Sequence, residues 1–243
     1  MNAIARRALI TGASGGIGAA ICRQLARSGH QLYLHAFQGA KRVQALAQEL
    51  NAANVCAEVL LFDVTDQLAV QAALEHVLAK GAIQILINNA GVHDDAVMPG
   101  MSALQWQRVI DVSVQGFFNV TQPLLMPMIR TRWGRIVNIS SVAALKGNRG
   151  QVNYAAAKGA LNSATRALAL EVATRGITVN AVAPGIIETP MTAQRFDAAV
   201  TARMVPMQRA GSPEEVAQLV GFLAGERASY ITGQVISING GMF

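Results

Sequence analysis

Residues 8–18 read Ala8-Leu-Ile-Thr-Gly-Ala-Ser-Gly-Gly-Ile-Gly18, an apolar run that leads directly into a turn rich in glycine. The spaced glycines are Gly12, Gly16 and Gly18, and residues 17–28 continue as a helical pattern that Gly29 ends. Glycine lets a backbone approach a pyrophosphate closely, and the N–H groups that begin a helix bind anions. A strand, a glycine turn and a helix in this order predict the first unit of a dinucleotide-binding sheet.

The rest of the chain repeats this alternation of short apolar runs and helical patterns, which is typical of a parallel sheet covered on both faces. We predict an α/β fold with a doubly wound, Rossmann-like parallel sheet in three layers, as a single domain over residues 1–243. Ser212-Pro213-Glu214-Glu215 predicts a capped helix start. The predicted strands cover residues 8–10, 31–36, 57–62, 83–87, 135–139, 178–183 and 235–238, and the other predicted helices cover residues 17–28, 40–51, 66–80, 106–130 and 153–174.

The segment around residues 186–211 breaks this alternation, because it holds Pro190, Pro206 and several methionines. We interpret it as an inserted lid over a substrate site. Methionines here and earlier in the chain fit a flexible acyl site and ordinary core packing equally well. They are Met98, Met191, Met204 and Met207.

The chain has 243 residues, of which 52% are hydrophobic and 14% charged, and this composition is sufficient for one large core. The net charge of +6 favours an anionic cofactor or an acidic partner. The basic residues are scattered and aromatic residues make up only 5%, so we expect no nucleic-acid partner.

Neither cysteine nor histidine spacing indicates a metal site. Cys22 and Cys56 form no paired motif, and the four histidines are isolated, so we expect two reduced, buried thiols and no metal.

The uncharged stretch 112–129 is long enough for a membrane span, but it contains three amide side chains and two prolines. We interpret it as a helix buried between protein surfaces and expect a cytoplasmic protein with no membrane contact.

Tyr154 and Lys158 are four residues apart, so on a helix they share one face, and Ser141 precedes them. A cation beside a phenol favours the phenolate and moves its pKa from about 10 toward neutral pH. At ~4 Å and an effective dielectric of ~20, one charge contributes up to ~4 kcal/mol. An amphipathic helix with a chance Tyr and Lys is the bland alternative. The ordered motifs around this pair favour a general acid.

The end of the second predicted strand distinguishes two cofactors. An NAD site requires an acid there for the ribose hydroxyls, but no acid occurs between His35 and Glu49. Lys41 and Arg42 suit a 2′-phosphate instead, which favours NADPH over NADH, although solvated cations at the start of a helix explain them equally. Asp63-Val64 and Asn88–Gly91 follow the next two strands, at the sheet edge where ligands bind.

Taken together, these motifs resemble the short-chain dehydrogenase/reductases over nearly the full length. More narrowly, three stretches resemble the 3-oxoacyl-[acyl-carrier-protein] reductases of fatty acid synthesis. They are Gly134-Arg-Ile-Val-Asn-Ile-Ser140, Gly176-Ile-Thr-Val-Asn-Ala-Val-Ala-Pro-Gly185, and Tyr230-Ile-Thr-Gly233 with Asn239-Gly-Gly-Met242.

The resemblance implies an NADPH-dependent reduction of a 3-oxoacyl thioester to the 3-hydroxyacyl thioester. It implies that Tyr154 protonates the carbonyl oxygen, that Lys158 binds the nicotinamide ribose and lowers the pKa of Tyr154, and that Ser141 orients the carbonyl. The cofactor contacts that we predict are Gly12, Ser14, Gly15, Gly16, Ile17, Gly18, Phe37, Lys41, Arg42, Asp63, Val64, Asn89, Ala90, Gly91, Tyr154, Lys158, Pro184, Gly185, Ile187 and Thr189.

Two residues depart from the family pattern. Ser113 stands where the family has an asparagine that helps hold a water in a proton relay from Lys158. Serine can hydrogen-bond to the carbonyl of the preceding turn instead, so we predict reduced but not abolished activity. Gly15 replaces a basic residue that NADP-using relatives often carry, which weakens the preference for NADPH.

The resemblance also implies an acidic acyl carrier protein held by basic residues near the mouth of the site, and a homotetramer built on the fourth and fifth helices. The matching basic positions are Arg132 and Arg175, with Arg130, Lys146 and Arg149 nearby. Two alternatives remain: a reductase or dehydrogenase of a free small ketone or alcohol, and a weakly catalytic cofactor-binding paralogue, which Ser113 suggests.

Overall fold

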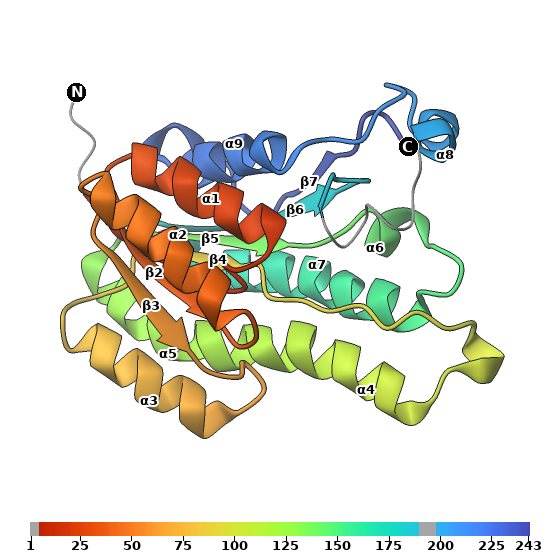
Figure 1. Ribbon diagram of the computed structural model, residues 1–243. Coiled ribbons are helices and arrows are strands. Elements are labelled where there is room, and N and C mark those ends of the chain that lie inside the picture. Colours follow the sequence, from red (N-terminus) through yellow and green to blue (C-terminus); the bar gives the residue numbers. More distant parts are fainter. Residues whose placement is uncertain (1–4, 190–197) are drawn as a thin grey trace.

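The computed structural model describes residues 5–189 and 198–243, and these form one parallel sheet between two layers of helices (Figure 1). The strand order is β3-β2-β1-β4-β5-β6-β7, which reverses direction between β1 and β4 as in a doubly wound sheet. The strands are β1 (Arg7–Ile10), β2 (Gln31–Ala36), β3 (Ala57–Leu61), β4 (Ile85–Asn88), β5 (Gly134–Ile139), β6 (Ile177–Pro184) and β7 (Val235–Ile238).

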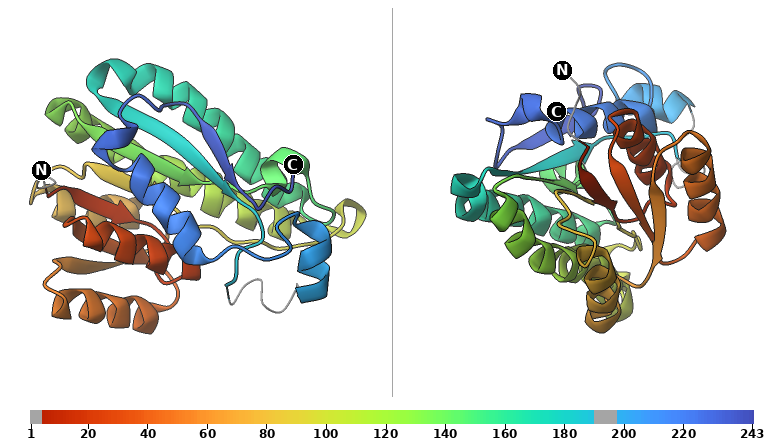
Figure 2. Two further views of the ribbon diagram at one scale, coloured as in Figure 1. Left: turned by 90° about the horizontal axis from the view of Figure 1, so that it is seen from above. Right: turned by 90° about the vertical axis from the view of Figure 1, so that its left-hand side faces the viewer.

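Apolar residues on both faces of the sheet create two cores, which explains why the central strands are apolar throughout. One core packs under α1 (Gly16–Arg27), α2 (Ala40–Ala52) and α9 (Pro213–Leu223). The other packs under α3 (Gln67–Leu78), α5 (Gly116–Thr131) and α7 (Val152–Val172). Figure 2 shows the layers from two further directions and confirms the predicted three-layer architecture.

Shorter helical pieces connect these layers, and the predicted capped start of α9 is confirmed. Ser212 Oγ accepts from Glu215 N at 3.2 Å, and Glu215 Oε2 accepts from Ser212 N at 2.8 Å. The shorter elements are η1 (Met98–Gly100), α4 (Ala103–Ile110), η2 (Asp111–Gln115), α6 (Ala143–Lys146), η3 (Ala173–Arg175), α8 (Ala198–Met204) and η4 (Glu226–Ala228).

The single helix predicted over residues 106–130 is wrong in detail. It begins earlier, because Ser102 and Gln105 form a capping box at the start of α4, and it is interrupted by the π-helical turn η2. Gly116 follows this turn, and a Cβ there would lie 2.8 Å from Val64 Cγ2, so the chain passes close to the end of β3. The extra residue of the turn is accommodated by tertiary packing that the sequence pattern does not reveal.

Other expectations also need correction. Cys22 is buried, but Cys56 is exposed because it lies in the turn before the edge strand β3. Of the predicted lid, residues 190–197 lie outside the described residues, as does Met191, whereas α8 and the Ile187–Gly211 bridge are described. Across the described ranges, no helix is long and apolar enough to cross a membrane.

Candidate active site

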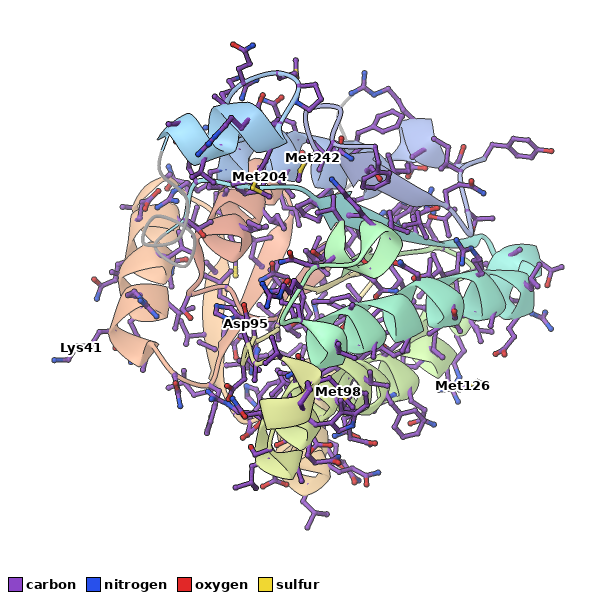
Figure 3. All side chains as sticks on the ribbon, turned by 90° about the vertical axis from the view of Figure 1, so that its right-hand side faces the viewer. Lys41, Asp95, Met98, Met126, Met204 and Met242 are labelled. Carbon is purple, nitrogen blue, oxygen red and sulfur yellow. The ribbon has the colours of Figure 1, made fainter. Side chains whose placement is uncertain are left out.

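The predicted catalytic residues and most of the predicted cofactor residues gather where the parallel strands end, which we call the carboxyl edge of the sheet. The glycine turn follows β1, Asp63 follows β3, Asn89 follows β4, and Ser141 follows β5. Figure 3 looks onto this side of the molecule, where the labelled side chains of Asp95, Met98 and Met204 lie. Open parallel sheets bind their ligands at this edge.

Hydrogen bonds join the glycine turn to the segment after β4. Thr11 Oγ1 accepts from the N–H groups of Asn89 and Ala90, both at 2.9 Å. Asn89 Nδ2 donates to the carbonyl oxygens of Thr11 at 2.9 Å and Gly12 at 3.0 Å. Two motifs that are far apart in the sequence therefore form one rigid wall of the site.

The glycine turn fits a dinucleotide pyrophosphate. A Cβ on Gly12 would lie 2.9 Å from Asn89 Nδ2, and a Cβ on Gly18 would overlap the Gly12 carbonyl oxygen. No side chain caps α1 at Gly15, so the N–H groups of its first turn are available to an anion. Gly16 and Ile17, two of the predicted cofactor contacts, lie in this first turn.

His35 is a site residue that the sequence analysis missed, since it treated the four histidines as isolated. Its side chain is 2% exposed, and its Nδ1 accepts from Gly12 N at 3.2 Å while Nε2 lies 2.9 Å from the Phe62 carbonyl oxygen. Its own carbonyl accepts from Ala13 N at 2.8 Å. Burial lowers the pKa of His35 to about 4, so the ring is neutral. Its Nδ1 and the His35 carbonyl together hold Gly12 and Ala13 at the start of the glycine turn. Its position in β2, next to β1, was the only available signal.

The side chains of Arg42 and Lys41, both in the first turn of α2 after the end of β2, point in different directions. Gly39 begins α2 with a φ of 88°, and a Cβ there would lie 2.9 Å from Arg42 Nη2 and 3.1 Å from Ser14 Oγ. The Arg42 guanidinium and the Ser14 hydroxyl therefore both lie beside Gly39, and the hydroxyl donates to the Gln38 carbonyl at 3.1 Å. Lys41 extends away from the molecule (Figure 3). Phe37 is 58% exposed at the same edge.

The remaining predicted cofactor residues line the same edge with different exposure. Asp63 Oδ1 accepts from the backbone and hydroxyl of Thr65, both at 2.9 Å, so it shapes a local turn. Val64 is buried, and its carbonyl accepts from Asn119 Nδ2 at 2.9 Å. Pro184, Gly185, Ile187 and Thr189 follow one another at the end of β6, where Gly185 N donates to the Ile238 carbonyl.

Tyr154, Lys158 and Ser141 are brought together as predicted. Lys158 is 3% exposed, its Nζ donates to the Ile139 carbonyl at 2.8 Å, and this Nζ lies 5.7 Å from the centre of the Tyr154 ring. A Cβ on Gly91 would lie 3.1 Å from the same Nζ, so glycine keeps the approach to the ammonium open. Burial lowers the pKa of Lys158 to about 8.

The pKa of Tyr154 is raised in this chain, and not lowered as we predicted from its neighbour Lys158. Burial raises the pKa of Tyr154, a hydrogen bond with Ser141 acts in the opposite direction, and the Asp95 carboxylate raises it further. The phenolate loses more hydration than these neighbours replace. The protonated phenol is the favoured form, which suits a group that donates a proton.

Two polar residues missed in the sequence position this phenol. Asn153 is fully buried, and its Nδ2 donates to the carbonyls of Asp94 at 2.9 Å and Gln105 at 3.1 Å. Asp95 Oδ2 accepts from Gln151 Nε2 at 2.9 Å. The start of α7 is thereby tied to the loop after β4, and no sequence spacing reveals such contacts.

Ser113 lies within the π-helical turn η2, 3% exposed, and η2 packs against α7. The expected hydrogen bond to the carbonyl of the preceding turn is absent, because Ser113 Oγ has no hydrogen-bond partner among the described residues. The π-helical turn changes the i−4 geometry on which such a bond depends. A buried hydroxyl without a partner is costly in free energy and marks this position as a polar site that a bound water or ligand would satisfy.

Arg132 and Arg175 are exposed but do not lie near the mouth of the site in this chain. They precede β5 and β6, whereas Ser141 and Gly185 follow these strands. Six residues of β5 at about 3.3 Å each separate the two edges by roughly 20 Å. Arg132 Nη2 donates to the Thr174 carbonyl at 3.3 Å, so the two arginines neighbour each other at the amino edge.

Comparison with known proteins agrees with this geometry. A family model described as "Enoyl-(Acyl carrier protein) reductase" matches residues 12–243. Two curated relatives, both named 3-oxoacyl-[acyl-carrier-protein] reductase, match nearly the whole chain. The one from Aquifex aeolicus is 46% identical over 97% of this chain and 96% of its own length. The one from Aggregatibacter actinomycetemcomitans is 44% identical over 96% of this chain and 98% of its own length. The chain belongs to the short-chain dehydrogenase/reductase family.

Other members differ in substrate. An acetoacetyl-CoA reductase from an Acinetobacter species is 42% identical over 97% of both chains. A crystal structure from Agrobacterium tumefaciens, described as a proposed gluconate dehydrogenase, superposes with a TM-score of 0.95 over 99% of this chain and 97% of its own, at 32% identity. This short-chain dehydrogenase/reductase is therefore an oxidoreductase that uses a nicotinamide cofactor, and its glycine turn and Lys158 fit that cofactor.

Replacing His35 by phenylalanine is expected to weaken cofactor binding about tenfold. The change leaves the Gly12 N–H buried without its acceptor, which destabilises this conformation of the glycine turn by about 1–3 kcal/mol. Quenching of cofactor fluorescence on titration measures the dissociation constant. His30→Phe is the matched control, because His30 Nδ1 also accepts a backbone N–H at 3.2 Å, before β2 and away from the site. Equal loss of affinity in both variants would contradict a positioning role for His35.

Replacing Lys158 by methionine is expected to stabilise the fold while abolishing turnover. The drop in the pKa of Lys158 from 10.5 to about 8 corresponds to roughly 3 kcal/mol. Stability contributed by the neutral amine is present above pH 10.5 and is lost as the pH falls toward 8. Urea unfolding at pH 7 should show the variant more stable than the parent, with the difference shrinking by pH 10. Lys80→Met, which removes an exposed lysine paired with Glu58, should show no such gain.

Proposed function

We propose that this protein reduces a 3-oxoacyl thioester, delivered on an acyl carrier protein, to the 3-hydroxyacyl thioester with NADPH. The observation that carries the proposal is the Tyr154 phenol, hydrogen-bonded to Ser141 beside the buried Lys158 ammonium at the carboxyl edge. Relatives named for this reaction are 44–46% identical over nearly the whole chain and support the choice of substrate.

Each catalytic residue has one task. The nicotinamide cofactor supplies the hydride that adds to the carbonyl carbon. Tyr154 donates its proton to the carbonyl oxygen, which becomes the hydroxyl, and Ser141 donates a hydrogen bond that holds that oxygen in place. Lys158 binds the ribose of the cofactor through the approach that Gly91 leaves open, and its charge favours the phenolate that remains after proton transfer.

The preference for NADPH rests on Arg42. Its guanidinium lies beside Gly39, next to Ser14 of the glycine turn, where it would donate to a 2′-phosphate, whereas the Ser14 hydroxyl already donates to the Gln38 carbonyl at 3.1 Å. The chain offers no acid between His35 and Glu49 for the ribose hydroxyls of NADH. Gly15 supplies no cation, so Arg42 is the residue on which we base the selectivity.

Assembly and location complete the proposal. We infer a homotetramer, because exposed apolar side chains such as Phe118 and Met126 on α5 would be covered in it. In such an assembly Arg132 and Arg175 would serve the site of a neighbouring subunit, since they lie at the amino edge of their own. Cytoplasmic localisation stays a prediction from the sequence.

The decisive experiment is the initial rate of NADPH oxidation with an acetoacetyl thioester on carrier protein, compared with the Tyr154→Phe variant. Phenylalanine keeps the ring and removes the acid, so we expect the rate to fall by at least about 100-fold with cofactor affinity retained. A faster rate with NADH would refute the assigned cofactor. Unchanged turnover in Tyr154→Phe would refute the assigned acid.

The weakly catalytic alternative depends on Ser113. Replacing Ser113 by asparagine restores the family side chain at a position whose hydroxyl has no partner among the described residues, and we expect a several-fold higher kcat. Ser113→Ala removes the unsatisfied hydroxyl without adding an amide, and is expected to raise thermal stability but not kcat. A lower kcat in Ser113→Asn would show that serine is the adapted residue here.

A free small ketone or alcohol is the second candidate substrate. It is favoured by the structural likeness to the Agrobacterium tumefaciens protein at 32% identity. Turnover of the carrier-bound thioester and of simple ketones with NADPH, and of gluconate with NADP+, at equal substrate concentration, separates the two candidates.

A further inference from the structure

The segment that follows β4 passes the Tyr154 phenol at close range. At one end of it, a Cβ on Gly91 would lie 3.1 Å from Lys158 Nζ. At the other end, the Asp94 carbonyl accepts from Asn153 Nδ2 at 2.9 Å. The Tyr154 ring belongs between these two points, because it follows Asn153 in α7 and its centre is 5.7 Å from Lys158 Nζ. The two residues between these contacts therefore lie alongside the phenol.

His93 is one of these two residues, and its imidazole is paired with the Asp95 carboxylate. His93 Nδ1 lies 3.2 Å from Asp95 Oδ1, and Asp95 Oδ2 accepts from Gln151 Nε2 at 2.9 Å. The pair therefore faces the start of α7, where Figure 3 labels Asp95. The neighbouring carboxylate points elsewhere, because Asp94 Oδ2 lies 3.4 Å from Arg108 Nη1 on α4.

His93 connects this part of the site with solvent, which Lys158 does not. Lys158 is 3% exposed, and its Nζ already donates to the Ile139 carbonyl at 2.8 Å. The Nδ1 of His93 is buried against Asp95, yet the side chain as a whole is 23% exposed. The ring thus has one side in the site and another at the surface. An imidazole can accept a proton on one nitrogen while the other is held by a carboxylate, which suits it to carry protons.

The proposed reduction creates a need for such a carrier. Each turnover removes one proton from Tyr154 and leaves a phenolate that must be protonated before the next turnover. The cofactor supplies only hydride, so this proton comes from solvent. Burial and the Asp95 carboxylate both raise the pKa of Tyr154, so the phenolate is a strong base that takes up a proton readily once a donor reaches it.

We propose that His93 returns this proton to Tyr154. The imidazolium protonates the phenolate through a hydrogen bond or one bridging water, and the neutral ring then takes a proton from solvent. Asp95 is the positioning residue, because it holds Nδ1 and so fixes the orientation of the ring. One turnover consumes one hydride from the nicotinamide cofactor and one proton from water, and His93 ends unchanged. The inference rests on the proposed function, because it requires Tyr154 to be the acid.

Rapid mixing separates this role from a structural one. The first turnover uses the proton already on Tyr154, whereas every later turnover needs a new one. His93→Gln keeps a polar side chain beside Asp95 but cannot be protonated. When its complex with NADPH is mixed with excess acetoacetyl thioester on carrier protein, we expect the first turnover at the parental rate and a steady-state rate at least about tenfold lower.

Two further variants sharpen the test. In His93→Ala, added imidazole is expected to restore the steady-state rate, because the free base can enter the space left by the side chain and carry the proton. His76→Gln is the matched control, since His76 Nε2 also lies 3.1 Å from a carboxylate, that of Glu58, but on the outer side of α3 and away from the site. This control should change neither phase.

Three outcomes overturn the proposal. An unchanged steady-state rate in His93→Gln would show that the phenolate is protonated without His93. An equal loss in the first turnover and in the steady state would show that His93 shapes the phenol or the thioester site instead. The third is a rate of His93→Ala that imidazole does not raise. A parent enzyme that reduces no thioester would instead refute the proposed function, and full turnover in Tyr154→Phe would refute its acid.

Discussion

A buried chain of hydrogen bonds between β5 and α7 is the constraint on which the site depends. Asn138 Nδ2 donates to Thr165 Oγ1 at 2.8 Å, and Asn88 Nδ2 donates to Asn138 Oδ1 at 2.9 Å. Lys158 is two helical turns before Thr165 and meets the carbonyl of Ile139, the residue after Asn138. Successive residues of the strand end thus set the position of the helix, and Ser141 next meets Tyr154 on that helix.

Buried polar groups make the site costly for stability. Lys158 loses its hydration for one carbonyl, Ser113 Oγ has no partner among the described residues, and His35 is held neutral under the glycine turn. The buried ammonium of Lys158 and the buried hydroxyl of Ser113 are groups for which an apolar residue would give a more stable fold. Proteins retain such groups where chemistry requires them, and here they gather around a single edge of the sheet.

The pattern of apolar and polar residues along the chain predicted the architecture well, but it predicted the packing between elements poorly. The strands were placed within about two residues, because apolar runs ended by glycine or polar residues mark them directly. The prediction of one helix over residues 106–130 was wrong at its start and missed the π-helical turn. The course of the chain at this turn depends on the close contact between Gly116 and Val64, which the sequence does not show. His35 was missed for the same reason: its partner, the Gly12 N–H, is contributed by another strand.

By itself, the sequence determined the parallel α/β sheet, the glycine turn and the trio Ser141, Tyr154 and Lys158, because each is encoded by residue types at fixed short spacing. Only the tertiary structure decided which charges meet which neighbours. It raised the pKa of Tyr154 where a pairwise argument lowered it, because burial outweighs the hydrogen bond with Ser141 and the Asp95 carboxylate acts in the same direction as burial. It also placed Arg132 and Arg175 at the amino edge of the sheet, away from the reacting groups, because distance across a strand does not follow distance along the chain.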